Sequence, residues 1–304
     1  YTTHYVDSYG YGSNTGGGRG QIENYGWTNA TYNSLLTINY DWHINEDWGL
    51  NAVVGNEIIQ SNRKKYYEYG TNYNFPGWNH INNATTQQTE EETWKNRTVG
   101  FFGNVSASYR NMLYLTLTGR QDYVSNMPRK NRSFFYPSIS AGFILTELDA
   151  LKNNVVNHAK LRVSYAEVGQ AGDFLENYYS TPTYGGGFYM LTPIMYPMKG
   201  TTAYTPYYTI FDPKLKPQNT RSYEVGADVN FLDNLITFSY TYSRQNVKDQ
   251  IFEVPLASST GASKLLTNGG KIHTNTHEFT LGFNPIRTKN INWDFAFNWT
   301  KIDN

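Results

Sequence analysis

The sequence predicts an all-β chain whose antiparallel strands form part of a transmembrane β-barrel. Three observations support this fold class: apolar and polar residues alternate along many segments, some of these segments are long, and short connections alternate with long ones. A strand that crosses a bilayer needs about 9–11 residues, whereas strands of soluble proteins most often have about 5–6. Outer-membrane barrels combine such strands with short turns on the periplasmic side and long loops on the outer side.

The clearest alternation lies in the second half of the chain. Tyr223 to Phe231 and Ile291 to Trp299 alternate over the length that a membrane-crossing strand needs. Shorter or weaker alternation predicts further strands at 36–41, 99–109, 113–118, 139–145, 161–165, 236–242 and 278–283. We expect the rings and aliphatic side chains of these strands to face lipid, and the charged and amide side chains to face water.

The connections between these segments fall into two classes. Short turns are expected at 42–49, 109–112, 231–235 and 285–290. Long, polar and ring-rich loops are expected at 61–96, 122–135 and 170–219. The stretch Glu147–Leu151 resembles a single helical turn within a connection. Loops of this length are uncommon in compact soluble domains. A soluble sandwich also has no reason to alternate short turns with long loops, so both features favour the barrel.

Composition narrows the classes of protein that remain. The chain has 304 residues, a formal net charge of zero and no cysteine. It therefore has neither a disulfide scaffold nor a cysteine-ligated zinc site, and it lacks the basic surplus that nucleic-acid binding needs. Aromatic residues make up 16%, yet the mean hydropathy is −0.61. That mixture is typical of strands with one apolar and one wet face, and no apolar run reaches the length of a transmembrane helix.

The sequence shows no constellation for covalent chemistry. His273 and His277 lie four residues apart, but in a strand this spacing separates them by about 13 Å, too far for a metal pair. No serine–histidine–aspartate set or pair of catalytic carboxylates stands out. We therefore expect no enzyme activity, no cofactor and no metal site.

Two groups of residues are candidates for a functional site. The first would line the water-filled interior of the barrel and comprises Arg120, Arg162, Glu224, Asp228 and Asp294, with Glu278 beside them. The second comprises rings of the long loops that would contact substrate: Tyr66, Tyr67, Tyr69, Trp78, Trp94, Tyr184, Phe188, Tyr189 and Tyr196, with Tyr207 and Tyr208 nearby. Rings stack on the apolar faces of sugars, but loops that pack on one another also use rings.

Several segments, in order along the chain, resemble the SusC/RagA branch of the TonB-dependent transporter family. They are Leu115–Asp122, Phe135–Phe143 (Phe-Tyr-Pro-Ser-Ile-Ser-Ala-Gly-Phe), Leu161–Gly169 (Leu-Arg-Val-Ser-Tyr-Ala-Glu-Val-Gly), Leu215–Gly226 with Leu-Lys-Pro-Gln-Asn-Thr, and Asn268–Ile272 with Asn-Gly-Gly-Lys-Ile. Their joint order is more specific than any one of them. The stretches 122–125 and 273–278 depart from the family pattern at strand ends or loops.

The resemblance implies a barrel of roughly 22 strands that encloses a plug. The 304 residues supply about 12 strands, so residues 1–304 are expected to form part of the barrel domain, with the plug, the TonB box and the C-terminal strands outside this chain. It further implies import of oligosaccharides or peptides across the outer membrane of a Gram-negative, Bacteroidetes-like bacterium. The implied partners are a SusD-like surface lipoprotein, the TonB–ExbB–ExbD complex acting through the plug, and the lipid bilayer.

Two other kinds of protein remain open at this point. One is a passive porin or adhesin barrel, which shares the strands and loops. The other is a soluble all-β glycan-binding protein such as a sandwich, in which the apolar faces of two sheets would enclose Phe238, Tyr240, Trp293 and Phe297.

Overall fold

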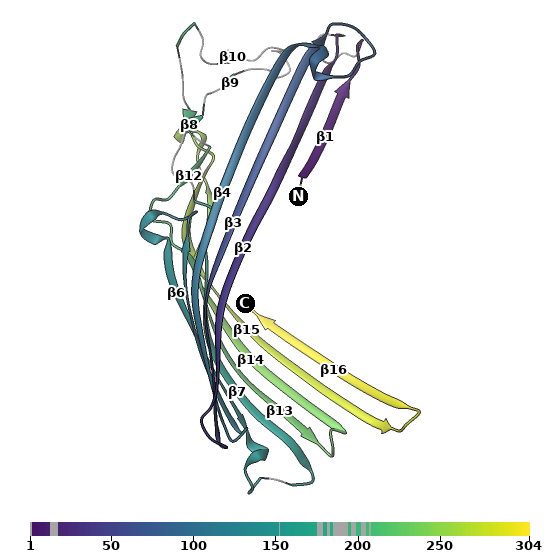
Figure 1. The fold of residues 1–304 in the computed structure, drawn as a ribbon, viewed down its shortest axis with the longest axis vertical. Coiled ribbons are helices and arrows are strands. Elements are labelled where there is room, and N and C mark those ends of the chain that lie inside the picture. Colours follow the sequence, from purple (N-terminus) through teal and green to yellow (C-terminus); the bar gives the residue numbers. More distant parts are fainter. Residues whose placement is uncertain are drawn as a thin grey trace. The chain divides into compact units, whose positions relative to one another are not determined.

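The computed structural model describes residues 2–12, 18–151, 153–174, 179–180, 183–184, 194–195, 199–201, 205–206 and 208–304 (Figure 1). Its long strands are β1 (Thr2–Tyr9), β2 (Gln21–His43), β3 (Trp48–Tyr73), β4 (Ala84–Tyr109), β5 (Leu113–Val124), β6 (Ser133–Ile144), β7 (Val156–Gln170), β13 (Gln218–Phe231), β14 (Ile236–Pro255), β15 (Lys264–Arg287) and β16 (Asn292–Asp303). Single 3-10 turns occur at η2 (Ile81–Asn83), η3 (Arg129–Asn131), η4 (Leu145–Glu147) and η5 (Ser258–Thr260).

Strand pairing follows chain order. Among the described residues, one 12-stranded sheet runs from β1 to β7 and continues through β13, β14 and β15, with β16 also paired to β15. The short β12 (Thr209–Phe211) joins β15 in parallel. Two small pairs stand apart, β8 (Tyr179–Ser180) with β11 (Thr205–Pro206) and β9 (Thr183–Tyr184) with β10 (Ile194–Met195). The predicted all-β class and the estimate of about 12 strands are confirmed.

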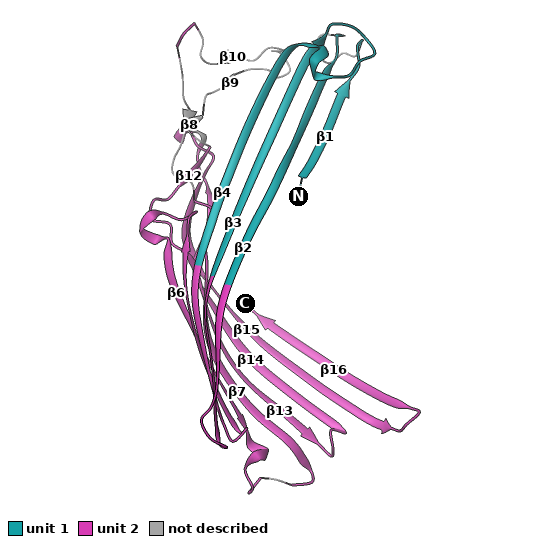
Figure 2. Cartoon of the chain, viewed as in Figure 1, with its two compact units in different colours: residues 1–35, 57–99 teal, residues 36–56, 100–304 magenta. Residues whose placement is uncertain are grey.

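The chain divides into two compact units (Figure 2). Unit 1 comprises Tyr1–Leu35 and Glu57–Val99, and unit 2 comprises Leu36–Asn56 and Gly100–Asn304. Strands β2, β3 and β4 contribute residues to both units.

In unit 2, side chains of one kind lie opposite one another from strand to strand. Phe238 of β14 lies opposite Val229 of β13 and Leu281 of β15, and Leu281 lies opposite Phe297 of β16. The intervening residues form polar rows, for example Asp228, Ser239, Thr280 and Asn298. We call these surfaces the apolar face and the polar face of unit 2. The predicted alternation is therefore confirmed across several strands, and register preserves it because the side-chain period is two.

The apolar face is open rather than packed into a closed interior. Trp293 is 58% exposed, Phe295 56% and Phe297 49%, while Phe238 and Tyr240 are half-buried among their neighbours in the sheet. A β-sandwich would bury such residues between two sheets. An apolar face exposed to this extent is the surface expected of a wall in lipid.

The connections alternate between two ends of the strands because neighbouring strands are antiparallel. One end has the short turns 44–47, 110–112, 232–235 and 288–291, together with the longer connection 145–155. At the opposite ends of their strands, unit 1 has the connections 10–20 and 74–83, and unit 2 has the connections 125–132, 171–217 and 256–263. The predicted sorting of short turns and long loops is confirmed only in part, because the connection 145–155 is longer than the connections 125–132 and 256–263 at the other end. The last turn also begins later than expected.

The expected long loop at 61–96 is wrong. Strand β3 continues to Tyr73 and β4 begins at Ala84, so the connection itself spans only 74–83. The polar stretches on either side are strands because backbone hydrogen bonds do not require an apolar face. The expected helical turn at Glu147–Leu151 lies slightly earlier, as the 3-10 turn Leu145–Glu147.

At the short-turn end, charged side chains tie neighbouring turns together. Arg110 Nε lies 2.9 Å from Asp47 Oδ1, and the backbone N–H of Arg110 donates to Asp47 O at 2.7 Å. The hydrogen bond from Arg110, together with its charge, holds the pKa of Asp47 below its usual range. Asn45 Oδ1 accepts from the backbone N–H groups of Asp47 and Trp48 at 2.9 Å, which closes the turn.

At the long-loop end of unit 2, a small core holds the loop bases. Val124, Met127, Phe211, Leu215 and Leu266 are buried, and Ala171 and Phe174 pack against them. Beside this core, Asn268 binds the backbone of Lys216 in both directions: Oδ1 accepts from its N–H at 2.6 Å and Nδ2 donates to its carbonyl at 2.8 Å. Asn131 Nδ2 also donates to the carbonyl of Leu215 at 2.8 Å. Both stems of the connection 171–217 are therefore fixed by the same core.

Candidate functional site

On the polar face of unit 2, Arg162 of β7 is at the centre of a network of charged residues. Its Nε donates to Asp228 Oδ2 at 2.9 Å and its Nη1 to Glu224 Oε1 at 3.1 Å. Its Nη2 donates to Thr241 Oγ1 at 2.7 Å. Gly226 lies directly opposite Arg162, and a Cβ there would come within 2.8 Å of the guanidinium carbon. The absent side chain thus lets the guanidinium lie flat against the sheet.

Two further predicted residues occupy the same face. Arg120 Nε lies 2.8 Å from Asp122 Oδ1, and Asp122 is buried and also accepts a hydrogen bond from the Tyr136 hydroxyl. On β16, Asp294 is hydrogen-bonded to Asn284 and to Asn292. Register places Arg120 in the polar series of β5, and Asp294 shares the parity of Asn298 on β16. The buried role of Asp122 was not predicted, because an acidic residue at a strand end resembles a solvated loop residue.

Beside Arg162, the polar face is hollowed because small residues meet there. Thr116, Ser140, Gly142 and Ser164 line a hollow of about 280 Å³. Tyr114, Lys160, Arg162 and Glu224 also line it. The result is a polar surface with room for water or for polar groups of another polypeptide.

In unit 1, one face of the sheet carries stacked rings. Tyr5 lies 5.0 Å from Tyr25 and 5.3 Å from Trp27, measured between ring centroids. Tyr67 and Tyr69 stack at 6.5 Å, with an angle of 8° between their planes. The Tyr69 hydroxyl donates to Gln21 Oε1 at 3.4 Å, and Gln21 shares its face of β2 with Tyr25 and Trp27 because the side-chain period is two.

We call this surface, formed by Tyr5, Tyr25, Trp27, Tyr67 and Tyr69, the ring face of unit 1. Trp94 contacts Arg63, whose guanidinium carbon lies 5.6 Å from the centre of its ring. By strand parity Arg63 shares the side of β3 that carries Tyr67. The sequence reasoning missed Tyr5, Tyr25 and Trp27, because their neighbours are polar and no apolar alternation marks them as parts of strands.

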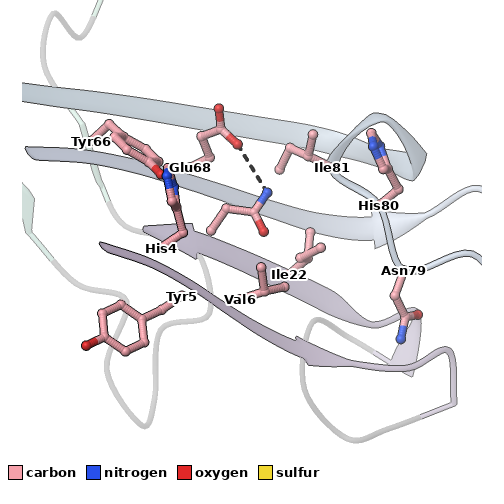
Figure 3. A pocket seen from close by; sticks show the side chains of 10 residues that line it. His4, Tyr5, Val6, Ile22, Tyr66, Glu68, Asn79, His80 and Ile81 are labelled. Carbon is pink, nitrogen blue, oxygen red and sulfur yellow. Dashed lines mark hydrogen bonds between the residues drawn. The ribbon is translucent and has the colours of Figure 1, made fainter. Parts of the chain in front are cut away.

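Tyr66, another predicted substrate contact, points to the opposite side of unit 1 from Tyr67. There it is hydrogen-bonded to His4, and Asn24 Nδ2 donates to Glu68 Oε2 at 3.1 Å (Figure 3). These residues surround a hollow of about 400 Å³, with Val6, Ile22 and Ile81 supplying apolar surface. Figure 3 shows Tyr5 pointing away from it. The predicted ring set is therefore split between two faces.

Trp78 lies in the connection 74–83, which is built around one buried side chain. Asn83 is fully buried, and its Nδ2 donates to the carbonyls of Phe75 and Trp78, each at 2.8 Å. The backbone N–H of Asn74 donates to the Asn83 carbonyl at 2.9 Å. The rings of Phe75, Trp78 and His80 stack outside this scaffold, at 5.7 Å and 5.0 Å. The loop thus presents rings on a fixed backbone.

The remaining predicted ring contacts lie outside the described residues. Phe188, Tyr189, Tyr196 and Tyr207 belong to this group, and so does the side chain of Tyr184. Tyr208 is described and exposed, and Lys264 Nζ lies 5.6 Å from its ring centre.

Within the part of the chain that the structure describes, no three histidine, cysteine, aspartate or glutamate side chains are grouped so that they could hold a metal ion. In the same residues, no helix has the length and apolar character needed to cross a membrane.

Comparison with known proteins assigns this architecture to a family. The family model described as TonB dependent receptor-like, beta-barrel, matches residues 1–304. The TonB-dependent receptor SusC of Bacteroides thetaiotaomicron is 27% identical over 306 residues, which cover 97% of this chain and 29% of the relative. The TonB-dependent receptor P26 of Formosa agariphila is 25% identical over 278 residues, covering 88% of this chain and 26% of the relative. The chain thus spans less than a third of either relative.

Solved structures show the same fold. The RagAB peptide transporter matches with a TM-score of 0.82 at 15% identity, covering 99% of this chain and 33% of the matched chain. The outer-membrane transporter YddB of Escherichia coli matches with a TM-score of 0.55 at 15% identity, covering 99% and 39%.

Proposed function

Because the chain belongs to the TonB-dependent receptor-like β-barrel family, we propose that it forms part of the wall of an energised outer-membrane nutrient importer. It is a SusC/RagA-like outer-membrane chain of the kind found in Bacteroidetes. The observation that carries the proposal is the separation of apolar and polar side chains onto opposite faces of unit 2. A wall between lipid and water needs this separation on every strand.

In this proposal, the polar face of unit 2 lines the interior of the barrel. Arg162, Glu224 and Asp228 would each cost energy facing lipid, about 2–4 kcal/mol for an arginine at the bilayer midplane. Facing water or a plug domain, they keep the partners described above. Arg120 and Asp294, on the same face, are assigned the same role.

The cargo that we propose is an oligosaccharide or a peptide, and the ring face of unit 1 is its proposed contact surface. Stacked tyrosines with hydroxyl and amide neighbours offer both apolar area and hydrogen bonds. A SusD-like lipoprotein would cover the long-loop side, and TonB–ExbB–ExbD would act through a plug. Support comes from the similarity to SusC and to the RagAB peptide transporter. Family membership favours this function over a passive porin, an adhesin or a soluble glycan-binding protein.

The test compares rings on opposite faces of the same strand. In a host that carries the full-length gene, Tyr67→Ala combined with Tyr69→Ala should reduce uptake of labelled oligosaccharides or peptides roughly tenfold, the usual effect of removing central rings from a contact surface. Tyr66→Ala, on the other face, should leave uptake close to wild type at equal surface abundance. Uptake that is insensitive to the double variant, or equally reduced by both, would contradict the proposed contact surface.

A further inference from the structure

The apolar face of unit 2 changes its chemistry from row to row along β13 to β16, which pair side by side in Figure 1. Nearest the short turns, Phe231, Ile236, Phe283 and Phe295 form one row, and Val229, Phe238, Leu281 and Phe297 form the next. The third row comprises Ala227, Tyr240, Phe279 and Trp299, and the fourth Val225, Tyr242, His277 and Lys301. Purely apolar rows thus give way to rings that carry polar atoms.

The mixed rows have the character of a membrane interface. The Tyr240 hydroxyl and His277 Nδ1 are hydrogen-bonded at 2.8 Å, and the ring of Tyr242 lies 5.0 Å from that of His277. One row further along, Tyr223 of β13 lies directly opposite Arg244 of β14 and pairs with Tyr165 of β7, with ring centroids 5.0 Å apart. Such amphipathic rings gather where lipid chains meet headgroups. We call this level the interface girdle.

From the outer edge of the girdle onward, the same face becomes basic. Arg244 follows Tyr242 on β14, and Lys248 lies further along, directly opposite Lys271 of β15. All three side chains are exposed, and no salt bridge to any of them occurs in the described part of the chain. By contrast, Lys301 is paired with Asp303 at 3.0 Å, and Arg221 with Glu167 at 3.3 Å. We call Arg244, Lys248 and Lys271 the cation patch.

The position of the cation patch fits the headgroup layer. At about 3.3 Å per residue, Arg244 lies about 7 Å and Lys248 about 20 Å beyond Tyr242 along the strand. Strand tilt reduces these heights to roughly 5 and 15 Å above Tyr242. The patch lies on the long-loop side, which the proposed function places outside the cell.

The direct pairing of Lys248 with Lys271 is also informative. Like charges opposite each other on neighbouring strands are unfavourable, and a bound anion between them removes the penalty. Lysine and arginine stems can lie along apolar surface while their charges reach toward headgroups. An anionic group in this position would contact Lys248 and Lys271, whereas Arg244 lies about 13 Å nearer the short turns, where it would contact a second anionic group of the same headgroup.

We propose that the cation patch binds the phosphorylated headgroup of an outer-leaflet glycolipid. The proposal rests on the membrane placement given above, but it concerns the outside of the wall and not the path of the cargo. A lipid is favoured over an acidic protein because the apolar rows, the girdle and the cation patch follow one another on the same face of β14 and β15. Each cation near a charged membrane surface contributes about 1 kcal/mol, which is roughly fivefold in affinity.

The experiment uses the full-length protein in detergent, titrated with the bisphosphorylated glucosamine-disaccharide lipid of lipopolysaccharide and with the same lipid after removal of its phosphates. The variant R244Q/K248Q/K271Q should bind the phosphorylated lipid roughly a hundredfold more weakly than wild type. The matched control K130Q/K214Q/K216Q removes three exposed cations from outer loops and should bind like wild type. Retention of the heat-modifiable folded band establishes that the variants are folded.

Several outcomes would overturn the proposal. They are equal binding by the patch variant and wild type, equal loss in the control, and equal binding of the dephosphorylated lipid. Competition by millimolar inorganic phosphate to the same extent as by the lipid would show an unspecific anion site instead. Retained lipid affinity together with loss of an acidic protein partner in the patch variant would assign the surface to that partner. Uptake of cargo in the Tyr67 experiment is read separately, so either proposal can fail alone.

Discussion

The two units use the same antiparallel pairing but place their side chains by different rules. In unit 2, each strand alternates between lipid-type and water-type residues, as Val229 and Asp228 show on β13. In unit 1, both faces of β3 are amphipathic, with Tyr67 on one side and Tyr66 and Glu68 on the other. Antiparallel backbone pairing therefore does not require apolar and polar side chains to alternate along a strand. Alternation is the pattern expected of a sheet whose two faces meet different solvents, and unit 2 shows this pattern whereas the part of β3 in unit 1 does not.

The largest expected effect comes from reversing one side chain of the unit 2 wall. Phe238→Arg or Phe295→Arg should block outer-membrane assembly, because an arginine near the bilayer midplane costs about 2–4 kcal/mol. Asp228→Asn, one row away on the polar face, keeps hydrogen-bonding capacity in a wet environment and should assemble. Cell fractionation and heat-modifiable mobility of the full-length protein measure the outcome, and equal tolerance of both changes would contradict the assigned faces.

A second change examines whether unit 1 is held by buried polar groups rather than by an apolar face. Asn83→Ala removes the amide that satisfies two carbonyls of the 74–83 connection, and each buried group left unpaired costs about 1–3 kcal/mol. We expect faster hydrogen exchange and protease cleavage in this connection, with normal membrane assembly. Asn82→Ala, at an exposed neighbouring position, serves as the control and should have little effect. Unchanged protection in Asn83→Ala would refute the anchoring role.

The smallest expected effect concerns the turns of unit 2. Because Arg110 lowers the pKa of Asp47, the pair stabilises the folded state above the unfolded pKa of about 3.9, and this contribution is lost as the pH falls through the lower folded value. The stability difference between wild type and Asp47→Asn should therefore be constant near pH 5–7 and shrink below about pH 4. Urea unfolding of vesicle-inserted protein measures it. A difference that grows on acidification would have the wrong sign.

Prediction from the sequence succeeded where alternation was strong. The strands β13 to β16 and the separation of Phe238 and Asp228 onto opposite faces follow from period two alone. It failed for β1, the first half of β2 and the parts of β3 and β4 that belong to unit 1. Neither face is apolar there, so the sequence shows no alternation. Candidate substrate contacts could be chosen as rings in polar segments, but the separation of Tyr66 from Tyr67 required knowing that both lie in a strand.

The family motifs show a second limit of prediction from the sequence. Leu215 and Asn268 were recognised by resemblance, yet their roles became visible only in three dimensions. Leu215 is fully buried in the loop core, and Asn268 binds the backbone of Lys216 across a separation of many residues. Sequence order records that such residues occur together, but not which backbone atoms they hold.

The two fixed stems of the connection 171–217 have a consequence for how such proteins diversify. Ala171 and Phe174 on one stem and Phe211 and Leu215 on the other enter the same small core, so the ends of the intervening chain are held close together whatever it contains. The entropy of closing a longer segment between fixed ends rises only slowly with its length. Evolution, or a designer of chimaeras, can therefore exchange this segment as a cassette while the wall beneath it stays the same.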